Sequence, residues 1–316
     1  MSAYGEELKI FTGNCHKKLA RDICQYLGTE LVSCEIGRFE DGEISVKIEE
    51  TVRGADVFVI QPTSPPVNEN IMELLVMIDA LRRASARRIT AVIPYYGYAR
   101  QDRKARGREP ITAKLVANLL YTAGVRRVLS IDMHAPQIQG FFDIPVDHLF
   151  STNIVVDHFQ NKNLDDMTAV APDVGSVKKV RTFAEKLNIP MAIIDKRRPQ
   201  PNVSRVMNVI GPVEDRNVVL YDDIIDTAGT ITNAAEVLDE MGAKNIYASC
   251  THALFSGPAV DRLKDSPVEE IITTNTIPQE EHAEVLDNLE ILSVAPLLGE
   301  AIDRIFKDVS VSVLFK

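Results

Sequence analysis

The densest group of chemically useful side chains lies at residues 222–230, where the sequence reads DDIIDTAGT. An apolar run precedes this segment and a helical pattern follows it, so its last residues fall at a helix N-terminus. Backbone N–H groups there, together with the hydroxyls of Thr227 and Thr230, can bind a phosphate monoester. The three aspartates suit paired sugar hydroxyls or a metal near them. A helix cap with solvated acids is the simpler alternative, but the combination favours a ribose 5-phosphate pocket.

Two groups of basic residues stand out in a chain whose formal net charge is −10. The first consists of Arg100, Arg103, Lys104, Arg106 and Arg108. A solvated basic face is the usual explanation for such a run, but here the run follows a strand and a turn, which favours an anion site on a loop. The second group, at 196–198, follows the strand 191–194, and from its residues alone it would be the solvated tip of a surface hairpin.

Two candidate metal ligands follow apolar strands. His134 comes after the run 128–131, and Asp173 comes after the run 169–171. In α/β proteins the carboxyl edge of the sheet is where ligands bind. A lone histidine is more often a hydrogen-bonded structural residue, and Mg²⁺ prefers oxygen ligands. We therefore expect any contact between His134 and a metal to be weak or assisted by phosphate oxygens.

A repeated order of strand, turn and helix must position these residues. The run 57–60 predicts a strand, and apolar residues at i, i+3, i+4, i+7 and i+10 predict a helix over 71–81. The same spacing returns in a strand at 218–221, a loop at 222–230 and a helix from 231 to 241. Short apolar runs that alternate with helices are typical of parallel sheets covered on both faces.

Length and composition set the overall organisation. A chain of 316 residues with 45% hydrophobic and 25% charged residues predicts about two globular domains. We predict an α/β fold of two similar domains, 1–147 and 148–316, each a mostly parallel sheet flanked by helices. A last strand at 309–315 is expected to pack on the first domain. The acidic balance and the absence of tryptophan argue against a nucleic-acid binder.

Cysteine usage and hydropathy bear on the cellular location. The four cysteines form neither a disulfide framework nor a zinc-site spacing, as is usual in a reducing cytosol. The first residues include acids where a signal peptide needs bases. No apolar run reaches the ~18 residues of a membrane helix. The sequence therefore predicts a cytoplasmic protein that does not enter membranes.

The motifs taken together resemble a known family. The segment 222–230 is similar to the phosphoribosyl-pyrophosphate (PRPP) loop of type I phosphoribosyltransferases, and over essentially its full length the chain resembles class I ribose-phosphate diphosphokinases, or PRPP synthetases. The further matching motifs are FEDGE at 39–43, YARQDRK at 98–104, DMHAPQIQGFF at 132–142, PDVG at 172–175, DKRRP at 195–199 and NTIPQE at 275–280.

The resemblance implies a reaction and a fold. Each domain would have the type I phosphoribosyltransferase fold. The enzyme would transfer the diphosphoryl group of MgATP to the C1 hydroxyl of ribose 5-phosphate, giving PRPP and AMP for nucleotide biosynthesis. Lys196 and Arg198 would be catalytic, on a loop that closes over the reacting phosphates. The family further implies dimers that assemble into a homohexamer, in which a neighbouring subunit supplies the residues that recognise adenine.

The resemblance also assigns binding residues. ATP would contact Phe39, Asp41, Gly42, Glu43, Arg100, Gln101 and Asp102. Ribose 5-phosphate would contact Asp222, Asp223, Asp226, Thr227, Ala228, Gly229 and Thr230. One or two Mg²⁺ ions would bind His134 and Asp173. An effector site for activating phosphate or inhibitory ADP would comprise Thr51, Arg53, Arg108, Ser310 and Ser312.

Two alternatives and two departures accompany this interpretation. A phosphoribosyltransferase would consume PRPP, but it has no use for the motifs of the first domain. A non-catalytic regulatory subunit of the same fold should have lost Lys196 and the residues around it. Ser176 and Ala228 stand where many family members have glycine. We expect both departures to affect loop geometry more than function.

Overall fold

The structure, a computed structural model, describes residues 7–197 and 206–315. The chain divides into two compact units. Unit 1 comprises Met1–Phe150, Thr276–Pro278 and Ser293–Lys316, and unit 2 comprises Ser151–Asn275 and Gln279–Leu292. The domain boundary expected after residue 147 falls inside a strand of unit 1, and the end of the chain returns to unit 1.

Unit 1 is built around a parallel sheet. Its strands are β1 (Leu8–Thr12), β2 (Cys34–Arg38), β3 (Ile44–Ile48), β4 (Asp56–Ile60), β5 (Arg88–Ile93), β6 (Arg127–Ile131) and β7 (Val146–Leu149). Its helices are α1 (Lys17–Leu27), α2 (Val67–Arg83), α3 (Thr112–Ala123), the 3-10 helix η1 (Pro136–Phe141), α9 (Ala295–Phe306) and the 3-10 helix η2 (Ser312–Phe315). The strand order is β1-β4-β5-β6-β7 with parallel pairing, whereas β2 and β3 form a separate antiparallel hairpin.

Burial explains why β4 and α2 form where they do. Every residue of β4 is buried, as expected for a strand covered on both faces. Val57 and Val59 share a hydrophobic core with Leu74 and Ile78, which lie on one face of α2. The helix predicted over 71–81 is confirmed, and it starts earlier, at Val67.

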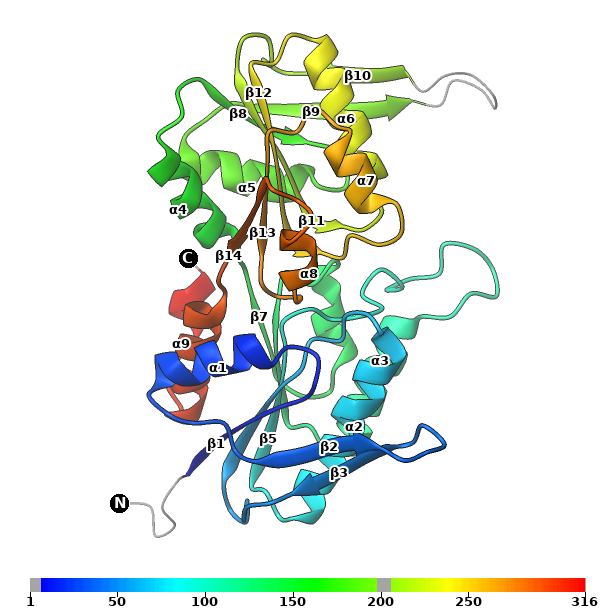
Figure 1. Cartoon of the computed structure of the whole chain (residues 1–316), viewed down its shortest axis with the longest axis vertical. Helices are drawn as coiled ribbons and strands as arrows, with labels where there is room; N and C mark the ends of the chain where they lie inside the picture. Colours follow the sequence, from blue (N-terminus) through cyan, green and yellow to red (C-terminus); the bar gives the residue numbers. More distant parts are fainter. Residues whose placement is uncertain (1–6, 198–205, 316) are drawn as a thin grey trace. The chain divides into compact units, whose positions relative to one another are not determined.

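The C-terminal helix α9 completes unit 1 by packing on α1 (Figure 1). The two helices approach closely at Gly299, where an added Cβ would lie 2.4 Å from Cδ1 of Tyr26. The Tyr26 hydroxyl also donates a hydrogen bond to Glu300 (3.0 Å). Glycine is therefore required at position 299 to bring the end of the chain against its beginning.

The strand predicted at 309–315 is wrong. Ser312–Phe315 forms the 3-10 helix η2, and the N–H of Leu314 donates to the carbonyl of Val311 (3.0 Å). Val309, Val313 and Phe315, whose alternation suggested a strand, are 42–50% exposed. A strand is stable only when a neighbour pairs with it, and here local hydrogen bonding replaces such pairing.

Unit 2 contains a larger sheet. Its strands are β8 (Met167–Ala171), β9 (Met191–Arg197), β10 (Val206–Ile210), β11 (Asn217–Ile225), β12 (Asn245–Ala253), β13 (Glu270–Thr274) and β14 (Leu289–Leu292). Its helices are α4 (Thr152–Lys162), α5 (Val177–Leu187), α6 (Gly229–Glu240), α7 (Ala259–Lys264) and α8 (Glu280–Ala283). The order is β10-β9-β8-β11-β12-β13-β14, in which β9 and β10 pair antiparallel and the other neighbours pair parallel.

The central strand β11 shows how both faces of this sheet are covered. Successive side chains of a strand point to opposite faces. Val218 and Leu220 belong to the core that α6 covers, whereas Val219 and Tyr221 belong to the core that α4 and α5 cover. The α/β fold with parallel sheets flanked by helices is therefore confirmed for both units.

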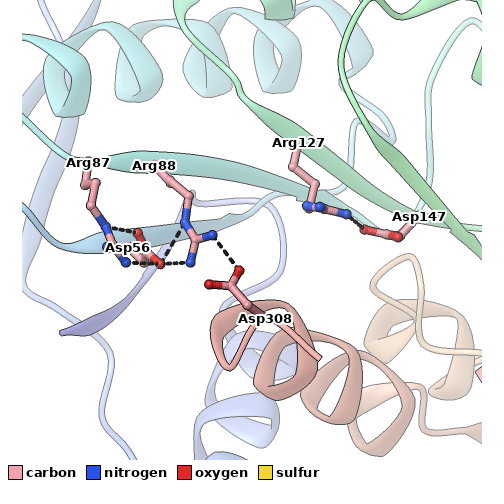
Figure 2. A network of polar contacts seen from close by, with 6 residues as sticks. All are labelled: Asp56, Arg87, Arg88, Arg127, Asp147 and Asp308. Atoms are coloured by element: carbon pink, nitrogen blue, oxygen red, sulfur yellow. Dashed lines mark hydrogen bonds and ion pairs between the residues drawn. The ribbon is translucent and has the colours of Figure 1, made fainter. Parts of the chain in front are cut away.

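An ionic network ties the amino ends of the unit 1 strands to the segment after α9 (Figure 2). Asp56, at the start of β4, is 2% exposed and accepts hydrogen bonds from Arg87 and Arg88. Arg88 also donates to Asp308 (2.7 Å). Burial alone would raise the pKa of Asp56, but the hydrogen bonds from Arg88 and Arg87 outweigh it and hold the pKa below its ordinary value. The network lies at the edge opposite to the one where α/β sheets bind ligands.

Replacing Asp56 by asparagine should lower the unfolding free energy by about 2–4 kcal/mol at neutral pH, because both guanidinium groups lose a buried anionic partner. A carboxyl whose folded pKa is depressed stabilises the fold above its unfolded pKa of about 3.9. That stabilisation disappears as the pH falls through the lower folded value. Urea denaturation of both proteins at several pH values measures the difference, which should shrink below about pH 4.

Asp79→Asn is the matched control. Asp79 forms an exposed i,i+4 pair with Arg83 on α2 (2.6 Å), and such pairs contribute only about 0.3–0.5 kcal/mol. Equal effects of the two substitutions would contradict a structural role for the Asp56 network.

Two further observations concern the chain as a whole. All four cysteines are free thiols. Among the described helices none combines the length and apolarity needed to cross a membrane.

Candidate active site

The acidic pair predicted to lie on a loop belongs to strand β11. β11 extends to Ile225, and it pairs with β12 through Asp222↔Cys250 and Ile225↔Ala253. The predicted loop is therefore wrong for residues 222–225, because hydrogen bonding to β12 continues past the last apolar residue of the run. The connection to α6 is only 226–228, and α6 begins at Gly229. The acids thus stand at the carboxyl end of a central strand.

The two carboxylates of the pair have different environments. Asp223 is 5% exposed, and its Oδ1 lies 2.7 Å from Nζ of Lys179 in the first turn of α5. Asp222 is half-buried, and its Oδ1 accepts the N–H of Asp223 (2.9 Å). Burial and then the charge of Asp223 raise the pKa of Asp222 to about 7. Near neutral pH, Asp222 can therefore donate or accept a hydrogen bond to a hydroxyl.

The turn after β11 presents a helix N-terminus to the same edge. Thr227 and Thr230 are exposed, and Ala228 is the N-cap residue of α6. The first N–H groups of a helix have no partner within the helix and attract anions. From the side of α7, Nη1 of Arg262 donates to the carbonyl of Thr227 (2.8 Å). Backbone amides, hydroxyls and a guanidinium therefore surround one short turn.

Ala228 adopts a left-handed conformation with φ 60°, which costs a non-glycine residue about 1–2 kcal/mol. Its methyl group is buried in the core under α6. That burial contributes about 0.8 kcal/mol, and alanine avoids the entropic cost of glycine, about 0.5–1 kcal/mol. These effects nearly cancel, so alanine fits where many family members have glycine.

Ala228→Gly should therefore change the unfolding free energy by less than about 1 kcal/mol. Ala228→Val should lower it by at least about 2 kcal/mol, since a β-branched residue is strained at positive φ and overfills the core. Thermal unfolding of both variants measures these changes. A valine variant as stable as the unaltered protein would show that the turn does not need this conformation.

Asp173 closes the turn that precedes the helix α5. Its Oδ1 accepts the N–H groups of Gly175 (2.9 Å) and Ser176 (3.2 Å), and the hydroxyl of Ser176 donates to the Asp173 carbonyl (3.0 Å). Ser176 has φ −85°, a conformation open to any residue. The departure from glycine at 176 is thus accommodated without strain, and the serine adds a hydrogen bond to the turn.

The segment with the proposed catalytic cations is partly a strand. β9 was expected to end at Ile194, but it continues to Arg197, with Lys196 opposite Met207 of β10. Antiparallel pairing with β10 extends the strand, because backbone hydrogen bonds between strands form whether the side chains are apolar or charged. The backbone of Lys196 is described, and Arg198 lies outside the described residues.

In unit 1 the predicted adenine residues form the tip of the β2–β3 hairpin (Figure 1). The N–H of Phe39 donates to the carbonyl of Glu43 (2.8 Å), and the N–H of Glu43 donates to Oδ1 of Asp41 (3.1 Å). Gly42 has φ 91°, which the tight turn requires. Phe39 is 61% exposed, so a large apolar ring faces outward beside two carboxylates.

The remaining predicted ATP residues lie on the loop between β5 and α3. Arg100 and Gln101 are exposed, and the Gln101 carbonyl accepts the N–H of Ala113 (3.2 Å). Oδ2 of Asp102 accepts a hydrogen bond from Nε2 of Gln137 in η1 (2.7 Å). The loop predicted for the basic cluster is confirmed. The contact with Gln137 brings this loop to the segment that follows β6.

His134 is exposed on that segment, just beyond the carboxyl end of β6. The buried His148 supports the segment: its Nε2 accepts the N–H of Met133 (2.8 Å), and its Nδ1 lies 3.2 Å from Nε2 of Gln139. The His134 backbone is therefore fixed from β7.

The five predicted effector residues are all exposed and lie in unit 1. Thr51 and Arg53 lie between β3 and β4. The hydroxyls of Ser310 and Ser312 are 2.7 Å apart, and Nη1 of Arg304 donates to the Ser310 carbonyl (3.1 Å). Among the described contacts, only the two serines of this group are brought together.

Sequence reasoning missed two cations beside the 222–230 segment, Lys179 and Arg262. Arg262 comes from a short helix far along the chain, and no spacing signalled it. Lys179 carried a weak signal: it stands four residues before Phe183, a buried residue of the same helix α5. Residues four apart share a helix face, so Lys179 should have been expected to point toward the sheet.

Comparison with known proteins identifies the family. Residues 8–124 match the N-terminal domain of ribose phosphate pyrophosphokinase, and residues 198–316 match the phosphoribosyl synthetase-associated domain. Curated proteins named ribose-phosphate pyrophosphokinase from Bacillus cereus and Bacillus caldolyticus are each 58% identical to this chain. The alignments cover 98% of the chain and 97% of the first relative, and 100% of both for the second. The chain belongs to the ribose-phosphate pyrophosphokinase family.

A solved structure supports the same family membership. The phosphoribosylpyrophosphate synthetase of Mycobacterium smegmatis matches with a TM-score of 0.91 and 43% sequence identity. The match covers 96% of this chain and 100% of that one. The resemblance first seen in separate motifs therefore extends over nearly the whole length of this chain.

Proposed function

We propose that the protein transfers the diphosphoryl group of MgATP to the C1 hydroxyl of ribose 5-phosphate, giving PRPP and AMP. Family membership over the whole chain carries the reaction. The arrangement at the end of β11 carries the location of the sugar phosphate, because two carboxylates and a helix N-terminus meet within nine residues. A phosphoribosyltransferase would need the arrangement at the end of β11, but it would not account for the family match over the whole chain.

In this proposal the α6 N-terminus and the hydroxyls of Thr227 and Thr230 bind the 5-phosphate. Asp222 and Asp223 hold the ribose hydroxyls, and Asp226 borders the same pocket. The C1 hydroxyl attacks the β-phosphorus in line, and AMP leaves. Phosphoryl transfer needs mainly positioning and charge stabilisation from the protein. Lys196 and Arg198 would stabilise the negative charge on the transferring group, and no dedicated general base is required.

Mg²⁺ would reach the site with ATP. Mg²⁺ tends to keep several waters and to bind one or two carboxylates plus substrate phosphates. Asp173 fits this role within unit 2 because the hydrogen bonds it accepts from the N–H groups of Gly175 and Ser176 both end on Oδ1. In unit 1 the proposed ligand is the exposed His134. Bound Mg²⁺ would neutralise charge on the phosphate oxygens.

ATP would bind through Arg100, Gln101 and Asp102 and through the hairpin tip with Phe39, Gly42 and its acids. The outward-facing ring of Phe39 supports a site that a second copy of the chain completes, since an exposed aromatic ring is normally covered in use. Ile111, Leu115 and Leu119 form an exposed apolar stripe along α3, which also suits a homo-oligomer such as a hexamer assembled from three dimers. Use of ATP favours a cytoplasmic location.

One assay tests the reaction. Purified protein is incubated with ATP, ribose 5-phosphate and Mg²⁺, and the products are followed by ³¹P NMR. AMP together with a sugar diphosphate is the expected result, whereas ADP, or no reaction at any phosphate concentration, would overturn the proposal.

Titrating inorganic phosphate in the same assay tests the effector site. Activity independent of phosphate would argue against an effector site made of Thr51, Arg53, Arg108, Ser310 and Ser312.

A further inference from the structure

Lys179 and Asp223 form a largely buried ion pair beside the proposed ribose pocket. Nζ of Lys179 lies 2.7 Å from Oδ1 of Asp223, and the two side chains are 25% and 7% exposed. Lys179 belongs to the first turn of α5, which packs on β8 and β11. The pair therefore joins a helix on one face of the sheet to the carboxyl end of its central strand.

The alternation of β11 explains why the cation reaches Asp223 rather than Asp222. Val219 and Tyr221 point to the face that α5 covers, and Asp223, two residues further, points to the same face. Asp222 follows Leu220 toward the face that α6 covers. One acid of the pair therefore has a fixed cationic partner from α5, and the other stands on the side of the phosphate-binding turn.

The same ammonium group connects two segments of the proposed site. α5 begins at the turn that Asp173 closes with its bonds to Gly175 and Ser176. Lys179 lies in the first helical turn after it, so the turn and the packing of α5 on the sheet together position the lysine. Through Lys179, the orientation of the Asp223 carboxylate depends on the segment that carries Asp173.

We propose that Lys179 is a positioning residue for ribose 5-phosphate, which holds the Asp223 carboxylate in the orientation that accepts a ribose hydroxyl. The inference rests on the proposed ribose site at 222–230. Two adjacent carboxylates repel each other and are costly to bury. Lys179 offsets this by neutralising one of them, which allows both acids to remain at the strand end without substrate. It touches no reacting atom in this role.

Three variants test the role: Lys179→Met, Lys179→Arg and Lys178→Met. Methionine keeps the length of the side chain and removes the charge, and arginine keeps the charge. Lys178 is the exposed neighbour on the same helix and serves as the control. Steady-state kinetics give kcat and the KM for each substrate, calorimetry gives ribose 5-phosphate affinity, and thermal unfolding reports on the fold.

We expect Lys179→Met to raise the KM and Kd for ribose 5-phosphate about 10- to 100-fold, the loss typical of one charge-assisted hydrogen bond. The KM for ATP should stay within about threefold, because no ATP group contacts this pair in the proposal. Lys179→Arg should recover most of the affinity, and Lys178→Met should match the unaltered protein. This split between substrates would not arise from general destabilisation.

A ribose 5-phosphate KM that is unchanged in Lys179→Met, or raised equally with the KM for ATP, would overturn the inference. If the methionine variant fails to fold, Lys179→Gln decides by the same measurement, because glutamine removes the charge and keeps a polar group. An unchanged KM for ribose 5-phosphate in a folded glutamine variant would overturn the inference. Thr230→Val separates this result from the proposed site itself. If Thr230→Val also leaves affinity unchanged, the location of the sugar phosphate is wrong.

Discussion

Lys196→Ala is expected to lower kcat by about 10³-fold, with a change of less than about fivefold in the KM for ribose 5-phosphate. Negative charge spreads over the transferring group and the departing AMP during the reaction. A cation that meets this charge only in the transition state raises kcat and contributes little to binding of the sugar phosphate. Removing it therefore separates the two kinetic constants.

The backbone of unit 2 supports this expectation. β9 lies beside β8, with Ile193 opposite Ala171, and Lys196 follows three residues later. Asp173 follows Ala171 by two residues. The two segments therefore run toward the same edge of the sheet, where α/β proteins bind ligands. A cation at 196 is carried toward the edge that holds the candidate metal and sugar residues.

Steady-state kinetics and single-turnover measurements check the effect. Lys186→Ala, at an exposed position of α5, is the matched control and should behave as the unaltered protein. Lys196→Arg tests whether any cation suffices. Turnover of Lys196→Ala close to that of the control would remove the catalytic role.

Asp223→Ala is expected to have the second large effect, because it removes the proposed contact with the ribose and breaks the ion pair with Lys179 at once. The KM for ribose 5-phosphate should rise about 100-fold, as for loss of a charged hydrogen-bond partner. Removing one member of a buried pair costs about 3–5 kcal/mol, and the partial exposure of Lys179 puts the expected loss of stability near the lower value.

A double variant separates the two consequences. Asp223→Ala with Lys179→Met no longer leaves an ammonium group without its partner, so it should recover stability but not affinity for ribose 5-phosphate. Urea denaturation and calorimetry measure the two quantities. Asp239→Ala, exposed on α6, is the control. Recovery of affinity in the double variant would show that Asp223 does not contact the sugar.

The sequence was most informative where local pattern and chemistry coincide. The apolar spacing of α2 and of β4 reflects burial on both faces of a sheet, which periodicity reports directly. The group of acids, threonines and glycine at 222–230 could be predicted as a strand end and a helix start because each residue type has its own reason to be there. The phosphate-binding turn that we propose there could be inferred without knowing any contact to a distant part of the chain.

Features that depend on distant parts of the chain were not predictable in this way. β11 extends through Ile225 because β12 pairs with it, although Asp222 and Asp223 interrupt the apolar run. The segment at 309–315 alternates like a strand but has no partner strand. Lys179 and Arg262 contact the 222–230 segment from α5 and α7, and local sequence patterns do not predict how those helices pack against it. Boundaries and supporting residues were therefore missed where tertiary contacts decide.

The packing of α9 on α1 has a consequence for how the chain is made. During synthesis the beginning of the chain leaves the ribosome first. The surface of α1 around Tyr26 stays uncovered until Gly299 has been made, almost the whole length of the chain later. Both segments of unit 2, 151–275 and 279–292, are made between these two parts of unit 1. Unit 1 is thus started first and finished last. Loss of α9 would therefore expose the surface of α1, near the beginning of the chain.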